Sequence, residues 1–316
     1  VVFLFKMFCF IFILVELCAA TDNVFDIMDD LVLLREKKVN PNNTFFSPLE
    51  SYHVNATAAT EKTYPWIAKV IHSKNNNHPY ICTASCIHEG IFITASRCIY
   101  RLKVTYTSVL YTAKRLPVRA FVFPSQPTTQ QFDDIGFIVI EKKNAQKFHI
   151  VQLHPLNEVK RTDDRFGWFS KMKLVGPFKV VGYVMKKGDR ITPTTAHDLK
   201  HLTVSIQIDL CWAVLTSGKR NGFHVPCYHS CNYETFNRIK GKCKGYLAVE
   251  GAAIINVKTK KIFGVATWGL HFSQYELPVG FSVVNSKSFI EDFECAKKIR
   301  NSNPITERSY QVLCKN

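Results

Sequence analysis

The stretch IFITASRC, residues 91–98, decides which fold we expect of this sequence. It begins as a run of apolar and β-branched residues, which is typical of a buried strand. It ends at Cys98, sixteen residues after Cys82, and its only charged residue is Arg97. The surroundings of this stretch therefore have to explain why a cation stands at the end of a buried strand.

Short apolar runs of the same kind recur along the chain from residue 64 onward, separated by polar or glycine-containing turns. Their spacing and their β-branched and aromatic residues predict an all-β barrel or sandwich. Near the end, Ser288 precedes Glu291 by three residues, and an apolar run at helical spacing follows. This capping-box pattern predicts one C-terminal helix. The expected strands are WIAKVIH, IFITAS, VTYTSVLYTA, RAFVFP, IGFIVIE, KVVGYVM, HLTVSIQI, AAIINV, KIFGVATW and VGFSVV.

Several motifs in this order resemble those of the trypsin-like and chymotrypsin-like serine proteases, over residues 53–294. ITASRC is similar to the family's T-A-A-H-C, DDIGFIVIE to its DIALL segment, ATWG to VSWG, and PVGFSVV before a helix to PGVYTRV. The resemblance implies two antiparallel six-stranded β-barrels with a cleft between them, followed by a C-terminal helix. It also implies a bridge between Cys82 and Cys98.

The residues at the catalytic positions depart from the family pattern. Asp134 matches the carboxylate, but Arg97 replaces the histidine, and a guanidinium cannot accept a proton near neutral pH. The segment matching G-D-S-G-G-P is CKGYLAVEGAAII, where one register puts Leu247 at the nucleophile and another puts Glu250 there. No serine occurs from residue 231 to 265, so the nucleophile is lost in either register.

The elements that activate such proteases are also missing. The junction that matches the activation site reads Tyr52-His53-Val54-Asn55 and offers no basic residue for cleavage. The aspartate that would receive the new amino terminus is replaced by Tyr246 or Val249. We therefore expect a homologue without functional catalytic residues, in which Arg97 pairs with Asp134 and reaches Glu250. The alternative is that Arg97 points into solvent.

The chain divides into four expected segments. Residues 1–20 read as a secretory signal peptide, since the apolar run is shorter than a membrane anchor, the alternative reading. Residues 21–52 form an N-terminal extension with a short helix and a loop, residues 53–294 the protease-like domain, and residues 295–316 the helix end and tail. Secretion agrees with glycosylation sequons at Asn42 and Asn55.

The cysteine count also agrees with secretion into an oxidising compartment. Nine of the 11 cysteines follow the signal segment, and in an oxidising compartment most of them should be bridged. The resemblance implies a second-barrel bridge from Cys211 to Cys227 or Cys231. The pairing of the remaining cysteines is open: Cys86, Cys231, Cys243, Cys295 and Cys314.

The segment HVPCYHSC, residues 224–231, contains two histidines and two cysteines that resemble a zinc site. We favour a disulfide with surface histidines there, and we predict no metal and no cofactor.

The formal net charge of +16 points to an acidic partner. Lysine and arginine clusters recur along the chain; each alone is explained by a solvated surface, but together they favour a sulfated glycan or another polyanion. Nucleic acid is disfavoured because no recognised nucleic-acid motif is present.

The function we expect is that of a secreted, non-catalytic protease homologue that binds protein partners as a cofactor, decoy or regulator. The alternative is a basic polyanion binder on the same scaffold. An active endopeptidase, or an enzyme with altered chemistry, is the least favoured reading because no replacement nucleophile and base are found.

Overall fold

The computed structural model describes residues 52–72, 80–100, 102–123, 134–142, 147–154, 176–185, 197–207, 227–231, 235, 243, 245–272, 275–284 and 287–302. The predicted signal peptide and nearly all of the N-terminal extension lie outside these residues. Among the described residues, no helix is long and apolar enough to cross a membrane.

The first barrel is a closed, six-stranded antiparallel sheet. Its strands in spatial order are β3 (Ile67–His72), β4 (Tyr80–His88), β5 (Ile91–Ala95), β8 (Ile135–Ile140), β7 (Lys114–Val122) and β6 (Thr107–Tyr111). Strands β5 and β8 are buried at every position, which explains why their sequences read as continuous apolar runs. Two short helices, α2 (Ser96–Ile99) and η1 (Val104–Tyr106), interrupt the strand sequence.

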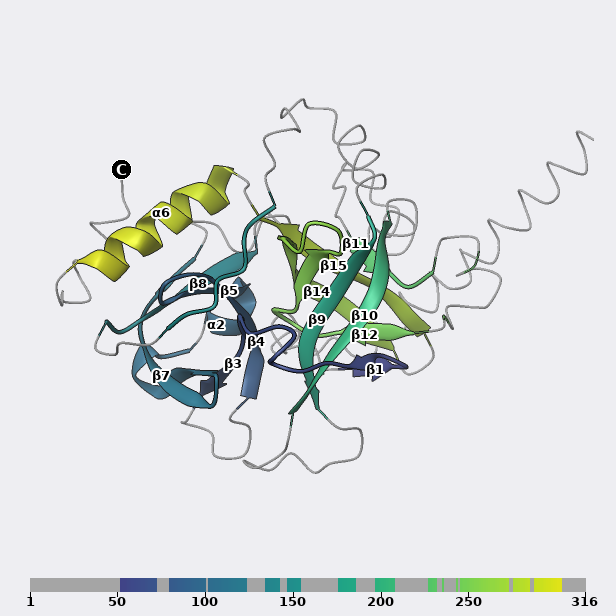
Figure 1. Cartoon of the computed structure of the whole chain (residues 1–316), viewed down its shortest axis with the longest axis horizontal. Helices are drawn as coiled ribbons and strands as arrows, with labels where there is room; N and C mark the ends of the chain where they lie inside the picture. Colours follow the sequence, from purple (N-terminus) through teal and green to yellow (C-terminus); the bar gives the residue numbers. More distant parts are fainter. Residues whose placement is uncertain are drawn as a thin grey trace, which may run out of the picture.

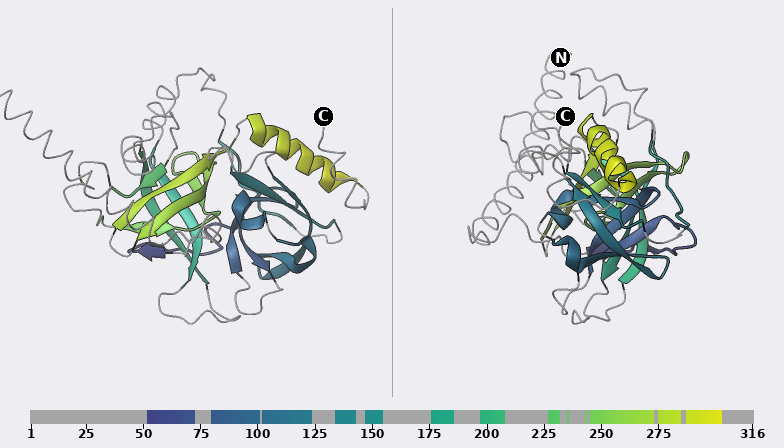
Figure 2. Two further views of the ribbon diagram at one scale, coloured as in Figure 1. Left: turned by 180° about the vertical axis from the view of Figure 1, so that it is seen from behind. Right: turned by 90° about the vertical axis from the view of Figure 1, so that its left-hand side faces the viewer.

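The second barrel closes through a pairing between β10 and β11. Its six strands are β9 (Phe178–Met185), β10 (His197–Gln207), β11 (Cys227–His229), β13 (Ala253–Asn256), β14 (Ile262–Phe272) and β15 (Tyr275–Val283). Strand β2 (Thr57–Ala58) extends β10, and β1 (Tyr52–Val54) pairs with β12 (Tyr246–Ala248). The barrels lie side by side (Figures 1 and 2), so the expected double barrel is confirmed.

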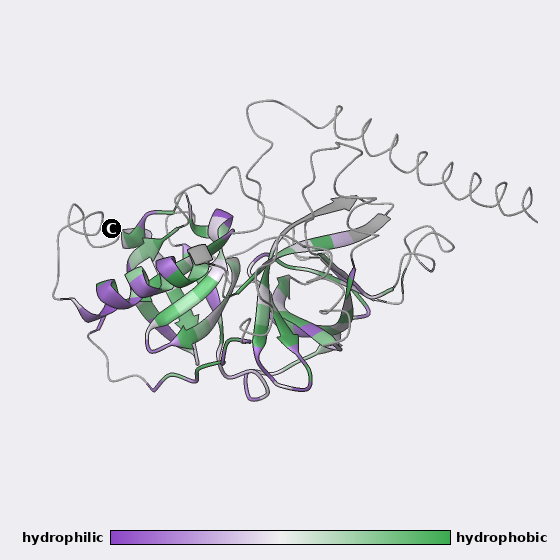
Figure 3. Cartoon of the chain, turned by 90° about the horizontal axis from the view of Figure 1, so that it is seen from above, coloured by the Kyte–Doolittle hydropathy of each residue, from purple (hydrophilic) through white to green (hydrophobic). Residues whose placement is uncertain are grey.

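The C-terminal helix α6 (Lys287–Asn301) lies against the first barrel (Figure 1). Phe289 packs against Phe137 of β8, with ring centroids 5.1 Å apart. Many residues of α6 are hydrophilic, whereas the strands beneath it are largely hydrophobic (Figure 3). The helix therefore covers one side of the first barrel, and it begins just before Ser288, which lies in its first turn rather than at its cap.

Strand β4 was missed from the sequence because its polar residues face the other barrel instead of solvent. Thr83 is fully buried, and its hydroxyl accepts a hydrogen bond from the backbone N–H of Tyr183 in β9 at 2.9 Å. The Thr83 N–H donates to the carbonyl of Glu250 at 3.1 Å. Strand β4 thus links the barrels where the expected catalytic positions meet.

Candidate functional site

Arg97 lies on α2, directly after β5. The backbone N–H of Ser96 donates to the carbonyl of Asp134 at 2.9 Å, and Asp134 immediately precedes β8. Because β5 pairs with β8 as far as Ala95 and Ile135, the turn into α2 is held beside Asp134. The neighbouring side chains Ser96 and Arg97 can therefore both reach the carboxylate.

Asp134 is a buried carboxylate with donors on both oxygens. The Arg97 Nε donates to Oδ2 at 2.8 Å, and the Ser96 hydroxyl donates to Oδ1. The backbone N–H of Asp134 also donates to the Ser282 hydroxyl at 3.0 Å. Burial raises the pKa of Asp134, although the Arg97 charge and the hydrogen bonds oppose this shift. The expected ion pair is present, and desolvation outweighs it in setting the protonation of the carboxyl group.

Glu250 supplies a second buried carboxylate from the other barrel. Its Oε1 lies 3.9 Å from the Arg97 Nε, and the Cys98 thiol donates to its Oε2 at 3.7 Å. The Arg97 side chain is 28% exposed, whereas that of Glu250 is 2% exposed. The structure therefore brings together all three positions expected from the sequence, with one guanidinium between two carboxylates.

Leu247 takes no part in this cluster. It belongs to β12, where it pairs with His53 of β1, and its side chain is fully buried in the core of the second barrel. Of the two registers that the sequence leaves open, the structure therefore places Glu250, and not Leu247, beside Arg97.

The described side chains of this cluster do not form a nucleophile with a base. The Ser96 hydroxyl donates to Asp134, and Arg97 can only donate hydrogen bonds. Burial, reinforced by Cys82 and Glu250, raises the pKa of the Cys98 thiol well above its usual value. The thiolate form of Cys98 is therefore disfavoured.

The predicted bridge between Cys82 and Cys98 is not formed in this structure. The two thiols are in contact, but both are buried and free, as is Cys86. The positions of Cys82 and Cys98 agree with the resemblance to trypsin-like proteases, while the covalent bond between them remains a prediction.

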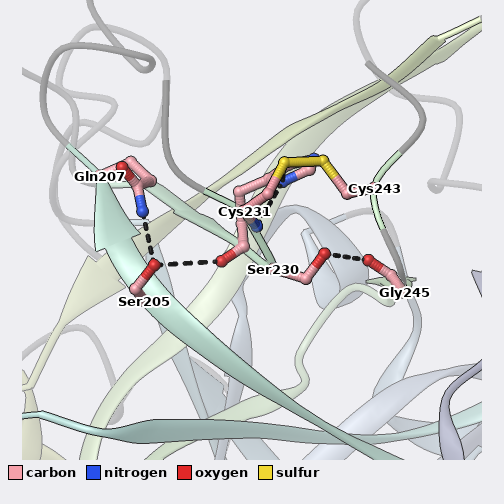
Figure 4. Close-up of a disulfide and its surroundings, with 7 residues drawn as sticks. Ser205, Gln207, Ser230, Cys231, Cys243 and Gly245 are labelled. Carbon is pink, nitrogen blue, oxygen red and sulfur yellow. Dashed lines mark hydrogen bonds between the residues drawn. A yellow bond between two sulfur atoms is a disulfide. The ribbon is translucent and has the colours of Figure 1, made fainter. Parts of the chain in front are cut away.

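The second barrel contains a disulfide whose pairing the sequence left open. Cys231 is bonded to Cys243, with Cα atoms 5.9 Å apart, and the Ser230 hydroxyl beside it donates to the carbonyl of Gly245 (Figure 4). Cys227 and Cys295 are also disulfide-bonded. Because Cys231 is taken by Cys243, the alternative bridge from Cys211 to Cys231 is wrong. Cys211 lies outside the described residues.

His229 corrects the expectation of a surface histidine, because it is 2% exposed. One potential ligand atom from each of His229, Cys231 and Cys243 lies within 4.8 Å of the others. The two sulfur atoms are bonded to each other, and the backbone N–H of Cys231 donates to His229 Nδ1 at 3.2 Å. Because thiolates, not disulfide sulfurs, bind metals, this arrangement is not a metal site.

Of the two predicted glycosylation sites, only Asn55 is described. It is exposed, with φ of 50°. Asn42 lies outside the described residues, and glycosylation remains a prediction.

Sequence reasoning also missed two residues that hold Asp134 in place, Ser96 and Ser282. Ser96 is inside ITASRC, so its position next to Arg97 was a usable signal. Ser282 is on β15, and its contact with the Asp134 N–H depends on the packing of the two barrels. Nothing in its local sequence indicates that contact.

Comparisons with known proteins agree with the double-barrel fold. The Trypsin family model matches residues 53–186, a range that includes Arg97 and Asp134 but ends before Glu250. The structure of the Vibrio cholerae VesB protease is similar with a TM-score of 0.50 and 14% identity, covering 77% of this chain and 67% of that chain. The secreted serine protease VesC from Vibrio cholerae gives a TM-score of 0.50 and 17% identity, covering 72% of this chain.

This chain spans 45% of the length of VesC. At these identities the two likenesses show the fold alone. No curated protein sequence matches the chain. The chain therefore has the trypsin-like double barrel, and its residues 53–186 match the trypsin family.

Proposed function

We propose that this protein is a secreted, non-catalytic homologue of trypsin-like serine proteases that acts by binding protein partners, as a cofactor, decoy or regulator. The observation that carries the proposal is the Arg97 guanidinium, 2.8 Å from Asp134 and 3.9 Å from Glu250. It occupies the position where the protease mechanism needs a proton acceptor.

Two further features support a protein that works without catalysis and without activation. The stretch from residue 231 to 265 contains no serine. The junction that a protease would cut in active relatives is strand β1, whose Tyr52 and Val54 pair with Ala248 and Tyr246 of β12. A backbone engaged in a sheet is a poor protease substrate, because cleavage needs local unfolding.

The disulfides support the proposed extracellular location. Cys227, Cys231, Cys243 and Cys295 are all bonded, and such bonds persist in oxidising environments. A folded, extracellular scaffold that does not catalyse a reaction acts through its surface.

Labelling by a fluorophosphonate and hydrolysis of chromogenic peptides test the proposal that the protein is non-catalytic. Both are measured before and after incubation with trypsin. Active trypsin is the positive control. We expect no labelling and no turnover in either state. Labelling of this chain that disappears in a Ser96→Ala or Ser282→Ala variant would identify a working nucleophile and overturn the proposal.

Affinity capture tests the proposal that the protein binds protein partners. The tagged protein is captured from its native fluid at physiological and at high salt, and each protein identified is then tested for direct binding with purified components. A purified protein partner that binds directly and resists high salt supports the proposal. Recovery of polyanions alone, all lost at high salt, would contradict it.

A further inference from the structure

Three lysines project from the turn between β13 and β14. The turn spans residues 257–261, VKTKK, and we refer to it as the lysine turn. Lys258 and Lys260 are exposed, and Lys261 is half-buried. Three cations within four residues make this turn the densest positive segment among the described residues of the second barrel.

The backbone of the lysine turn is held in one conformation. The buried Asn256 side chain accepts hydrogen bonds from the N–H groups of Lys258 and Thr259, each at 2.9 Å. Lys260 has φ of 58°, a region that glycine and asparagine favour, and its N–H donates to the Asn256 carbonyl at 2.9 Å. A fixed backbone reduces the entropy lost when the lysines bind a ligand.

The strands that pack against the turn add positive charge and no carboxylate. The N–H of Val257 donates to the carbonyl of Pro177 at 3.0 Å, which brings the start of β9 alongside. Lys179 of β9 is opposite Ile255, and its neighbours Phe178 and Val180 point into the core, so Lys179 points outward. Residues 147–154, 176–185 and 251–267 contain no aspartate or glutamate, so no carboxylate of these segments neutralises the lysines.

The chemistry of this surface favours a sulfated sugar chain over nucleic acid or a membrane. Single-stranded nucleic acids are held by aromatic stacking as well as by charge. The exposed aromatic side chains among the described residues are Tyr100 and Tyr106, both on the first barrel. Stable anchoring of a helix in a membrane surface combines cations with a buried apolar face. The only apolar residue of the turn is Val257, which is half-buried.

We propose that the lysine turn is a binding site for a linear sulfated polysaccharide. This activity goes beyond the protein partnership proposed above and does not depend on it. Sulfate groups would pair with the lysine ammonium groups, and the release of counterions from the glycan would drive the association.

The experiment compares two triple variants of the full chain in binding a heparin oligosaccharide at several salt concentrations. The turn variant carries Lys258→Gln, Lys260→Gln and Lys261→Gln. The matched control carries Lys103→Gln, Lys114→Gln and Arg115→Gln, which removes the same charge from exposed sites on the first barrel. Both variants keep Asn256 and the core, and thermal unfolding checks that they fold.

We expect the slope of log affinity against log salt to decrease in magnitude by about 2 to 3 in the turn variant. Each lysine removed means that about 0.7 to 0.9 fewer counterions are released from the glycan on binding. The affinity at physiological salt should fall at least about tenfold, and clearly more than in the control. Equal losses in both variants would mean that diffuse net charge, not this site, binds the glycan. Binding of a DNA oligonucleotide or of phosphatidylserine vesicles as tightly as heparin, with the same loss in the turn variant, would overturn the choice of a sulfated ligand.

Discussion

The Arg97 guanidinium can donate hydrogen bonds but accept none. Arg97 therefore cannot take up a proton, but it gives the Asp134 carboxylate a charged partner. Asp134 receives a charged donor from Arg97 and a hydroxyl donor from Ser96. A buried carboxylate without such donors is costly, because desolvation is then uncompensated.

The raised pKa of Asp134 gives a prediction about pH. Because burial raises this pKa above its usual value of 3.8, the folded state binds the proton more tightly than the unfolded state. Asp134 therefore contributes stability that is present below pH 3.8 and lost as the pH rises through the folded-state pKa. The free energy of unfolding of the wild type, minus that of Asp134→Asn, should fall as the pH rises through this window.

Urea unfolding of both proteins across the acid range measures this difference. A difference that increases with pH would mean that the pairing with Arg97 outweighs burial, and would contradict the assignment.

At the scale of elements, the turn after β12 brings Glu250 from the second barrel to the first. Gly251 adopts φ of 77°, and its N–H donates to the carbonyl of Ala266 at 2.8 Å. A Cβ at Gly251 would lie 1.9 Å from the carbonyl oxygen of Thr83 in β4. The close contact of the two barrels, and with it the position of Glu250, therefore depends on glycine at this position.

Replacing Gly251 by alanine should destabilise the protein by roughly 3 kcal/mol or more, because backbone strain and a backbone clash combine. Gly90→Ala is a matched control. Gly90 also has a positive φ, of 67°, but its Cβ would meet the side chain of Arg300, with 2.5 Å to Nε. A side chain yields more easily than a backbone carbonyl, so we expect a smaller loss for Gly90→Ala in chemical denaturation. Equal losses would show that the barrels separate readily at Thr83.

At the scale of the whole molecule, the sequence was most informative where strands are buried on both faces. The apolar runs of β5 and β8 predict those strands directly, because every residue faces a core. The run VTYTSVLYTA was interpreted as one strand, but residues 104–106 form η1 and only Thr107–Tyr111 is β6. No local sequence pattern predicts how one barrel packs on the other, and β4 was missed for that reason.

The candidate site could be predicted from the sequence only in part. Arg97 and Asp134 are within motifs whose spacing to their strands is fixed, so their meeting followed from the resemblance. Glu250 and Leu247 are three residues apart in a segment without a clear family motif, and only the three-dimensional turn at Gly251 decides between them. The partner of Cys231 was equally open, because cysteine connectivity depends on the folded chain.

We propose that the ion pair between Arg97 and Asp134 stabilises the fold, with no proton acceptor at position 97. A double-mutant cycle with Arg97→Ala, Asp134→Ala and the double variant, followed by chemical denaturation, tests it most directly. Arg119→Ala combined with Asp134→Ala is the control, since Arg119 instead donates to the carbonyl of Ser302 at 2.9 Å.

We expect a coupling free energy of about 1 kcal/mol or more between Arg97 and Asp134, and additivity within about 0.5 kcal/mol for the control. Additive effects of Arg97→Ala and Asp134→Ala would mean that the two residues do not interact, and would contradict the claim.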